Sequence, residues 1–250
     1  MNGKFLNSLL AGAALAGATA FSDLEAAPVK QNTKITSTVK ANNTLKANDG
    51  WNVPLSDFMD EAISFIKKWE GKVIDDAGNH VLYDDDTSKT VKPRWDGKGG
   101  KKGIERFIKS CKGKPTIGYG ETDPRRVRLG KISDEQATSW LSNRIVSIHN
   151  KLTDQFTING STRLSNYPGK AGMFTLLSPN QKIALISFHY NLGSGFMKYK
   201  TQKMRTAFQA GDWDNVRYEM RDCINSNGKP VEGLRNRRKA EMELWNTPWN

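Results

Sequence analysis

Two segments of this sequence carry side chains whose types and placement could do chemistry. Glu70 lies in Trp69-Glu70-Gly71, where an apolar helical pattern ends, and residues 116–120 read Thr-Ile-Gly-Tyr-Gly. A carboxylic acid beside apolar groups at the end of a helix is the kind of group that donates a proton in general acid catalysis. A glycine-rich, β-prone segment can hold a hydroxyl group, here that of Thr116, against a substrate. Together they predict an active site that needs a third member.

A second carboxylate is the natural third member. The chain after Gly71 supplies Asp75 and Asp76 and then the run Asp84, Asp85 and Asp86. Glycoside hydrolysis uses such a pair, because one acid protonates the leaving oxygen while another carboxylate activates water or stabilises the oxocarbenium ion. Taken alone, the same residues also fit an ordinary helix-end glutamate and a solvated acidic turn. A complete EF-hand calcium loop is absent.

Apolar periodicity predicts the elements that position these residues. A helix capped by Ser56 and ended by Gly71 precedes a loop-rich β region over 72–121, with strands near 81–83 and 116–119. A capping-box pair, Ser133 and Gln136, opens a helix to residue 152, and a second pair, Ser178 and Gln181, opens one that Gly193 closes. Further helices are predicted over 203–209, 212–221 and 233–245. The fold class is therefore α+β, mostly α.

The N-terminal residues differ in composition from the rest. Residues 5–21 follow Lys4, carry no charge and lead to Ala18-Thr19-Ala20, a pattern typical of a secretory signal. We therefore expect residues 1–27 to be a signal peptide or a releasable signal anchor, with transient inner-membrane association through 5–21. Residues 28–50, rich in Lys, Asn, Thr and Ser, predict a flexible basic linker. The folded domain is expected over 51–250, exported to a periplasm or the extracellular space.

The net charge, the cysteines and the histidines limit which classes of partner and cofactor are expected. The formal net charge of the 250-residue chain is +12, which favours an anionic partner such as nucleic acid, a membrane surface or an envelope polymer. The basic residues are interspersed with acidic ones without a base-reading motif, so nucleic acid is the weakest of these options. Cys111 and Cys223 fit one disulfide or two free thiols. The three histidines lack metal-ligand spacing, so neither a metal nor another cofactor is expected.

Several segments together resemble the phage-type lysozymes (glycoside hydrolase family 24). Residues 69–71, 83–85 and 116–120 are similar to the family's Glu-Gly, Tyr-x-Asp and Thr-Ile-Gly-Tyr-Gly motifs. Residues 181–193 resemble its helix ending in Asn-x-Gly, and residues 233–245 resemble its Gly-Leu-x-x-Arg-Arg-x-x-Glu segment. The resemblance therefore extends over the whole expected folded domain.

The resemblance implies a two-lobed lysozyme fold, a small β lobe and a helical lobe joined by the helix over 133–152. It implies a monomeric enzyme that hydrolyses the β-1,4 bond between N-acetylmuramic acid and N-acetylglucosamine in peptidoglycan, an anionic polymer. If the chain is phage-encoded, the host periplasm is where it would act. By the resemblance, Glu70 is the general acid, Asp85 the second carboxylate, and Thr116 helps to hold the attacking water.

The sequence also departs from the family. Residues 86–115 replace a tight hairpin, so Asp84, Asp86 and Asp96 stay open as alternatives to Asp85, and Cys111 stands near the position where some members use cysteine. Glu121 occupies the place of a usual histidine. Two other functions remain open: a lytic transglycosylase acting on the same polymer, and a catalytically inactive wall-binding module.

Overall fold

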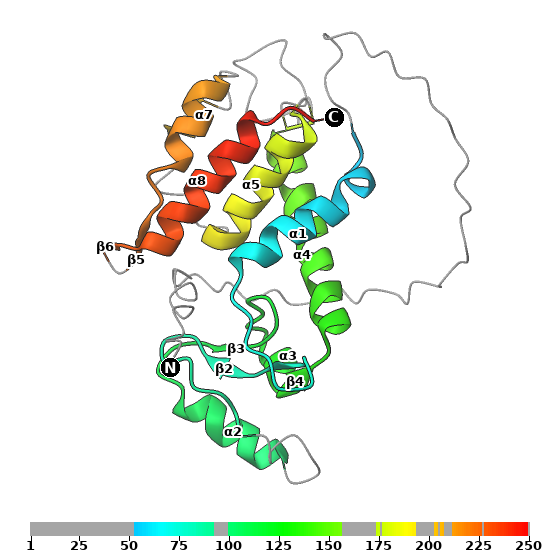
Figure 1. Ribbon diagram of the computed structural model, residues 1–250, viewed down its shortest axis with the longest axis vertical. Coiled ribbons are helices and arrows are strands. Elements are labelled where there is room, and N and C mark those ends of the chain that lie inside the picture. The colour runs from blue at the N-terminus through cyan, green and yellow to red at the C-terminus, as the bar shows by residue number, and fades with distance from the viewer. Residues whose placement is uncertain are drawn as a thin grey trace, which may run out of the picture.

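The computed structural model describes residues 53–92, 100–156, 174–175, 177–193, 203–204, 206–207, 212–226 and 228–249. The segments 1–27 and 28–50, and the predicted domain start at Trp51, lie outside these residues. Figure 1 shows two lobes, a larger helical one and a smaller one with short strands, with helix α4 (Asp134–Phe156) running from one to the other. The predicted α+β, mostly α class and the joining helix are confirmed.

The helical lobe is built around α5 (Pro179–Leu192), which packs against α1 (Met59–Trp69), α4 and α8 (Glu232–Asn246). Leu185 and Phe188 of α5, with Ile66 of α1 and Ile145 of α4, are wholly buried. Each such side chain contributes about 1.5–3 kcal/mol of burial free energy. Helix α7 (Trp213–Met220) packs on α8, and β5 (Asn225–Ser226) pairs with β6 (Lys229–Pro230) just before α8 begins.

The small lobe is held together by two short antiparallel pairings. Strand β1 (His80–Val81) pairs with β4 (Lys131–Ile132), and β2 (Tyr83–Asp84) pairs with β3 (Pro115–Thr116). The second register places Tyr83 opposite Thr116. The long stretch between β2 and β3 therefore leaves the pairing of the two strands intact.

Most predicted helix boundaries agree with the structure. Ser178 and Gln181 form the complete capping box of α5, and Gly193 ends the helix at a φ of 66°. At α4, the Gln136 amide donates to Ser133 Oγ at 3.2 Å. Helices α7 and α8 match the predictions over 212–221 and 233–245. Of the predicted helix 203–209, the four residues that are described are helical.

The predicted start of the first helix was wrong. Ser56 lies in a 3₁₀ turn, η1 (Leu55–Asp57), and α1 begins at Met59 after Phe58, without a side-chain cap. Phe58 is wholly buried, so the burial of this side chain, rather than a hydrogen bond to a serine hydroxyl, sets where α1 begins. The helix ends at Trp69, and Glu70 has an extended backbone.

The prediction that residues 72–121 form only loops and strands was also wrong, because helix α2 (Gly100–Ser110) lies within them. Gly100 and Gly103 lower its helix propensity, and only a narrow stripe of apolar residues marks it. Ile104 and Phe107 bury that stripe in the core. Tertiary packing therefore stabilises a helix that the sequence only weakly favours. A short helix, α3 (Pro124–Val127), follows β3 and is capped by Asp123.

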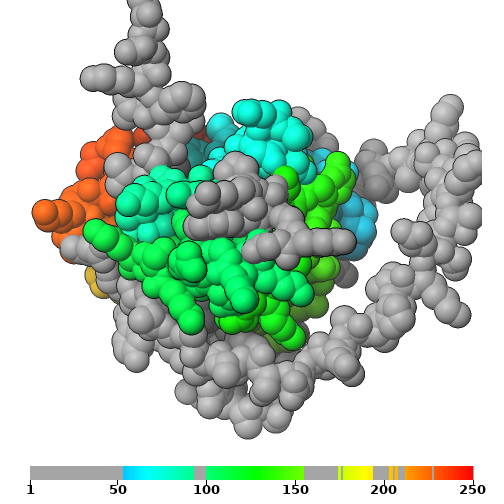
Figure 2. All heavy atoms as spheres, turned by 90° about the horizontal axis from the view of Figure 1, so that it is seen from below, coloured from blue at the N-terminus to red at the C-terminus, as the bar shows by residue number. Residues whose placement is uncertain are grey.

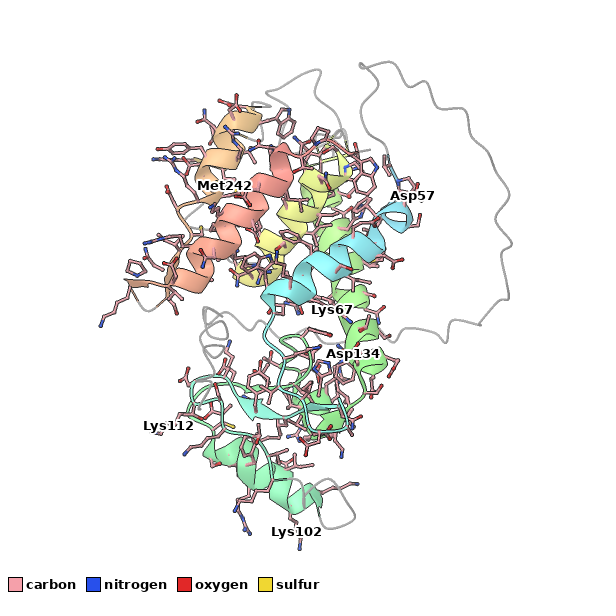
Figure 3. All side chains as sticks on the ribbon, in the orientation of Figure 1. Asp57, Lys67, Lys102, Lys112, Asp134 and Met242 are labelled. Atoms are coloured by element: carbon pink, nitrogen blue, oxygen red, sulfur yellow. The ribbon has the colours of Figure 1, made fainter. Side chains whose placement is uncertain are left out.

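Asp134, the first residue of α4, ties the two lobes together. Its carboxylate accepts hydrogen bonds from Tyr119 Oη at 2.6 Å and Lys67 Nζ of α1 at 3.1 Å, and lies 2.9 Å from His80 Nε2. Figure 3 shows Lys67 and Asp134 facing each other where the lobes meet. The hydrogen bonds, that from Tyr119 foremost, hold the pKa of Asp134 far below its usual value.

We expect Asp134→Asn to lower the free energy of unfolding at pH 7 by about 1–2 kcal/mol, a modest figure because the side chain is 45% exposed. A lowered pKa stabilises the fold above the unfolded-state value near 4, and this contribution is lost as the pH falls further. Urea unfolding at pH 7 and pH 3 checks this, with exposed Asp76→Asn as control. An equal loss at both pH values would contradict the linkage.

None of the helices in the described part of the chain is both long and apolar enough to cross a membrane.

Candidate active site

Glu70 caps the C-terminal end of α1, where the chain leaves the helical lobe. Its Oε1 accepts a hydrogen bond from Arg237 Nη1 at 2.6 Å, and 15% of its side chain is exposed. On the other side, a Cβ added to Gly120 would lie 3.4 Å from Oε2, and Gly120 has a φ of +85°. The positive φ therefore favours glycine at residue 120, while the distance from Oε2 is that of an ordinary van der Waals contact.

Arg237 is itself held by a buried cluster on α5 and α8. Its Nε donates to Glu241 Oε1 at 3.2 Å, and Arg238 forms an ion pair with the other oxygen of Glu241 at 3.1 Å. Ser187 of α5 donates to Glu241 Oε1 at 2.7 Å. Burial alone would lower the pKa of Arg237, but the charges of Glu70 and Glu241 outweigh it and raise the pKa. A fixed cation therefore positions the Glu70 carboxylate.

The aspartates at the end of β2 differ in their surroundings. Asp84 is buried, and both of its oxygens accept hydrogen bonds, from the amides of Lys112 and Gly113 at 2.9 Å and from Thr87 Oγ1 at 2.8 Å. Burial would raise the pKa of Asp84, but these bonds outweigh it and lower the pKa. Asp84 thus fastens the segment after α2 to β2. Asp86 is exposed, and Asp96 lies outside the described residues.

Asp85 is half-buried and differs from Asp84 in its electrostatics. The amide of Lys114 donates a short hydrogen bond to its Oδ1. Burial, and then the neighbouring charges of Asp86 and Asp84, raise the pKa of Asp85 despite that bond. A Cβ at Gly113 would lie 2.1 Å from Asp85 Oδ1 and 2.7 Å from the backbone nitrogen of Asp86, and because backbone cannot easily move aside, this position favours glycine.

Thr116 and Tyr83 lie opposite each other in the β2–β3 pairing. Thr116 is buried in β3 and its hydroxyl donates to the Lys114 carbonyl at 3.0 Å, which leaves the oxygen free to accept a hydrogen bond. Tyr83, opposite Thr116, has a raised pKa because of burial and then because of the charges of Glu70 and Asp85. One tyrosine therefore lies within the field of both predicted carboxylates. Asp85 and Thr116 both hydrogen-bond to the backbone of Lys114, and the charge of Glu70 acts on Tyr83, which faces Thr116.

A small hollow of about 50 Å³ adjoins this neighbourhood between the lobes. Tyr190 of α5 donates a short hydrogen bond to the Tyr119 carbonyl, which joins the helical lobe to the glycine-rich segment. Glu121, in the place of the family's histidine, accepts from Arg126 at 2.5 Å and from the amides of residues 122 and 123. The hollow is lined by Tyr119, Gly120, Glu121, Ala137, Trp140, Leu141, Arg144 and Tyr190.

Cys111 and Cys223 are both free thiols. Burial and the charges of Asp84 and Asp85 raise the pKa of Cys111 to about 11, so it stays protonated, and its Sγ lies 3.4 Å from the Phe107 carbonyl as a donor. Its packing at the end of α2 indicates a structural role. Within the described ranges, no three His, Cys, Asp or Glu side chains gather closely enough to hold a metal ion.

Arg237 is the residue that the sequence-based reasoning missed. The Gly-Leu-x-x-Arg-Arg-x-x-Glu segment contains it, and its spacing places Arg237 and Glu241 on the same side of a helix. That spacing predicts an ion pair within α8. It does not indicate that Arg237 also reaches Glu70, which directly follows α1 and is far away in the sequence.

Comparison with known families decides what the chain is. The model of the family described as "Phage lysozyme" matches residues 98–241, more than half of the chain. The chain belongs to the phage lysozyme family. The matched range includes Thr116, Arg237 and Glu241, and it begins after Glu70 and Asp85.

Individual relatives are distant. The SAR-endolysin of Escherichia phage P1 is 28% identical over 130 residues, which cover 52% of this chain and 65% of the relative. The SAR-endolysin of Escherichia phage Mu is 34% identical over 70 residues, which cover 28% of this chain and 40% of the relative. Among solved structures, the muramidase domain of SpmX from Asticaccaulis excentricus is 19% identical with a TM-score of 0.48, over 75% of this chain and 96% of the domain.

Proposed function

We propose that this phage lysozyme is an endolysin-like muramidase, which hydrolyses the β-1,4 bond between N-acetylmuramic acid and N-acetylglucosamine in peptidoglycan. Family membership, the endolysin relatives and the geometry around Glu70 support the proposal. The observation that carries it is that the charges of Glu70 and Asp85 both raise the pKa of Tyr83, which lies opposite Thr116 in the β2–β3 pairing.

In this proposal, Glu70 gives its proton to the glycosidic oxygen as the bond to the anomeric carbon breaks. The Arg237 guanidinium holds Oε1, so Oε2, on the side of Gly120, is the oxygen placed for the transfer. Asp85 accepts a proton from a water that attacks the anomeric carbon, and Thr116 Oγ1 accepts a hydrogen bond from the same water. The products are a new reducing end and a free hydroxyl on the leaving sugar.

Product analysis tests the proposal directly. Purified peptidoglycan is digested with the full chain, and the sugar ends are identified by reduction with borohydride followed by mass spectrometry. We expect reducing N-acetylmuramic acid ends. Anhydro-sugar ends would instead identify a lytic transglycosylase, which needs Glu70 but not a water held by Asp85 and Thr116. Absence of any cleavage would leave the inactive wall-binding module.

The raised pKa of Asp85 predicts how kcat/KM depends on pH under acidic conditions. A base must be deprotonated, so kcat/KM should fall as the pH drops through the Asp85 pKa, above the value near 4 of an exposed aspartate. The charge of Asp86 contributes to that rise, so Asp86→Asn should move the acid limb to lower pH. Exposed Asp76→Asn serves as the matched control and should leave the limb in place. If Asp86→Asn also leaves it in place, Asp85 is not the group that titrates.

We further propose that the chain acts after export, as a monomer, in a periplasm or outside the cell. The uncharged segment 5–21 and the basic segment 28–50 support this, as signal peptide or releasable anchor and as linker. Fractionation of cells that express the full chain, with or without residues 1–27, tests the placement. Retention of both forms in the cytoplasm would contradict export.

A further inference from the structure

Helix α2 carries a row of exposed cations that the proposed reaction does not use. Lys101, Lys102, Arg106 and Lys109 are all exposed, and we call them the α2 basic face. The opposite side of the helix is buried through Ile104 and Phe107. Figure 3 shows Lys102 at one end of α2, with its side chain directed away from the lobe. Figure 2 shows α2 lying across the face of the small lobe that is seen from below.

The charge of this face is not neutralised from within the described part of the chain. The only acidic residue of α2, Glu105, pairs with Arg128 at 2.5 Å. None of the four cations of the α2 basic face has an ion-pair partner among the described residues, whereas Arg126 and Arg237 have theirs. Four adjacent like charges repel one another, so an external anion placed along the helix would be attracted to all of them.

The same face lacks the side chains that insert into a lipid bilayer. A helix that binds a membrane surface presents large apolar side chains beside its basic ones. In α2, Ile104 is 5% exposed and Phe107 is 8% exposed, so both face the core. Ile108 is half-buried and packs against the same core, so the fully exposed residues of the helix are all charged or polar. This favours a hydrated polyanion, whose negative groups long lysine side chains can reach, over a membrane.

The position of α2 connects this surface to the proposed site. The helix leads directly into residues 112–114, whose amides hold Asp84 and Asp85. The α2 basic face and Asp85 therefore belong to the same lobe, where the segment that follows α2 contacts the Asp85 carboxylate. Figure 1 shows α2 on the side of the small lobe away from the helical lobe, so a polymer that extends from Asp85 over the small lobe would reach α2. In peptidoglycan, the negative groups next to a glycan strand are the carboxylates of the stem peptides.

We propose that the α2 basic face binds the stem-peptide carboxylates of peptidoglycan next to the glycan strand in the site. The inference rests on the proposed function for its choice of polymer. It predicts that binding to the wall has an electrostatic part that depends on the stem peptides and on these four residues. Cleavage of short glycan oligomers that lack peptides should not depend on the four residues of the α2 basic face.

Binding is measured by co-sedimentation with purified sacculi, with the full chain carrying Glu70→Gln so that the polymer stays whole. Changing Lys101, Lys102, Arg106 and Lys109 to glutamate should weaken binding at low salt by about tenfold or more, and about 1 M salt should remove the difference. Glutamine at the same positions, a good helix former, should weaken binding less. The matched control reverses four exposed cations of the helical lobe, Arg221, Lys229, Arg235 and Lys239, with the same change in net charge.

In the binding measurements, three outcomes would overturn the proposal: unchanged binding of the α2 variant, an equal loss in the control variant, or binding of the parent to anionic phospholipid vesicles but not to sacculi.

A second experiment tests the stem peptides as the partner. Sacculi stripped of stem peptides by an amidase should bind the α2 variant and its parent equally, and a persisting difference would contradict the carboxylates as partner. In the active chain, kcat/KM on a peptide-free glycan oligomer should be unchanged by the α2 substitutions. If the active chain cleaves nothing, the muramidase proposal fails. The co-sedimentation of the variants with sacculi still tests whether the α2 basic face binds the stem peptides.

Discussion

Glu70→Gln is expected to lower kcat on peptidoglycan by about a thousandfold, since positioned general acids contribute roughly 10²–10⁴. Glutamine has the same shape and keeps an oxygen that can accept the hydrogen bond from Arg237 Nη1, now 2.6 Å from Glu70. It has no proton to give to a leaving alkoxide. The variant should therefore bind the wall and remain folded while cleavage nearly stops, so the loss appears in kcat rather than in KM.

Turbidity loss of purified sacculi, combined with direct counting of new reducing ends, measures this effect. Glu61→Gln is the matched control, because Glu61 is an exposed glutamate of α1, the helix that ends just before Glu70. It should keep activity near that of the parent. Activity of Glu70→Gln within about fivefold of the parent would reject Glu70 as the proton donor. A comparable loss in both variants would mean that α1 is sensitive to any change of charge.

The sequence predicted a helix correctly where its capping residues and its buried side chains indicate the same boundaries. Ser178, Gln181 and Gly193 set both ends of α5, and the same helix has a nearly continuous run of buried residues. Where the two disagree, burial decided. Phe58 displaced the start of α1 from Ser56, and Ile104 with Phe107 made a helix of a glycine- and lysine-rich stretch. Such stretches look like loops until the surface that they cover is known.

The proposed site was predictable to the extent that its residues belong to short motifs. Tyr83 and Thr116 could be matched one segment at a time, and the β2–β3 register then placed them opposite each other. Asp85 could not be separated from Asp84 by sequence alone, because the difference lies in amides that return from residues 112–114. The pairing of Glu70 with Arg237 joins two helices that only the folded chain brings together.

The cluster behind Arg237 gives the C-terminal motif a physical meaning. Arg237 and Glu241 are spaced to pair within α8, Arg238 balances the remaining charge, and Ser187 supplies a hydrogen bond from α5. The cluster lies between α5 and α8 and contacts the carboxylate of Glu70, the residue that follows α1. Stability of the helical lobe and the placement of Glu70 therefore depend on the same buried charges.

Glu241→Ala is expected to destabilise the protein by about 3–5 kcal/mol, the range found when one partner of a buried ion pair is removed. Glu241 is wholly buried, and its loss would leave the guanidiniums of Arg237 and Arg238 facing each other with one carboxylate fewer. Ser187 would also lose its acceptor. Glu241→Gln keeps an acceptor for Ser187 but not the charge, so it should lie between the parent and the alanine variant.

Urea unfolding at pH 7 measures these differences, with Glu243→Ala as control. Glu243 lies on the same helix with its side chain 66% exposed, so its loss should cost no more than about 0.5 kcal/mol. The buried site differs because water cannot replace the missing carboxylate around two guanidiniums that are each 1% exposed. If Glu241→Ala unfolds at the same urea concentration as Glu243→Ala, the two arginines must reach water in solution. Arg237 would then be free to leave Glu70, and a fixed cation could not be what positions the proposed proton donor.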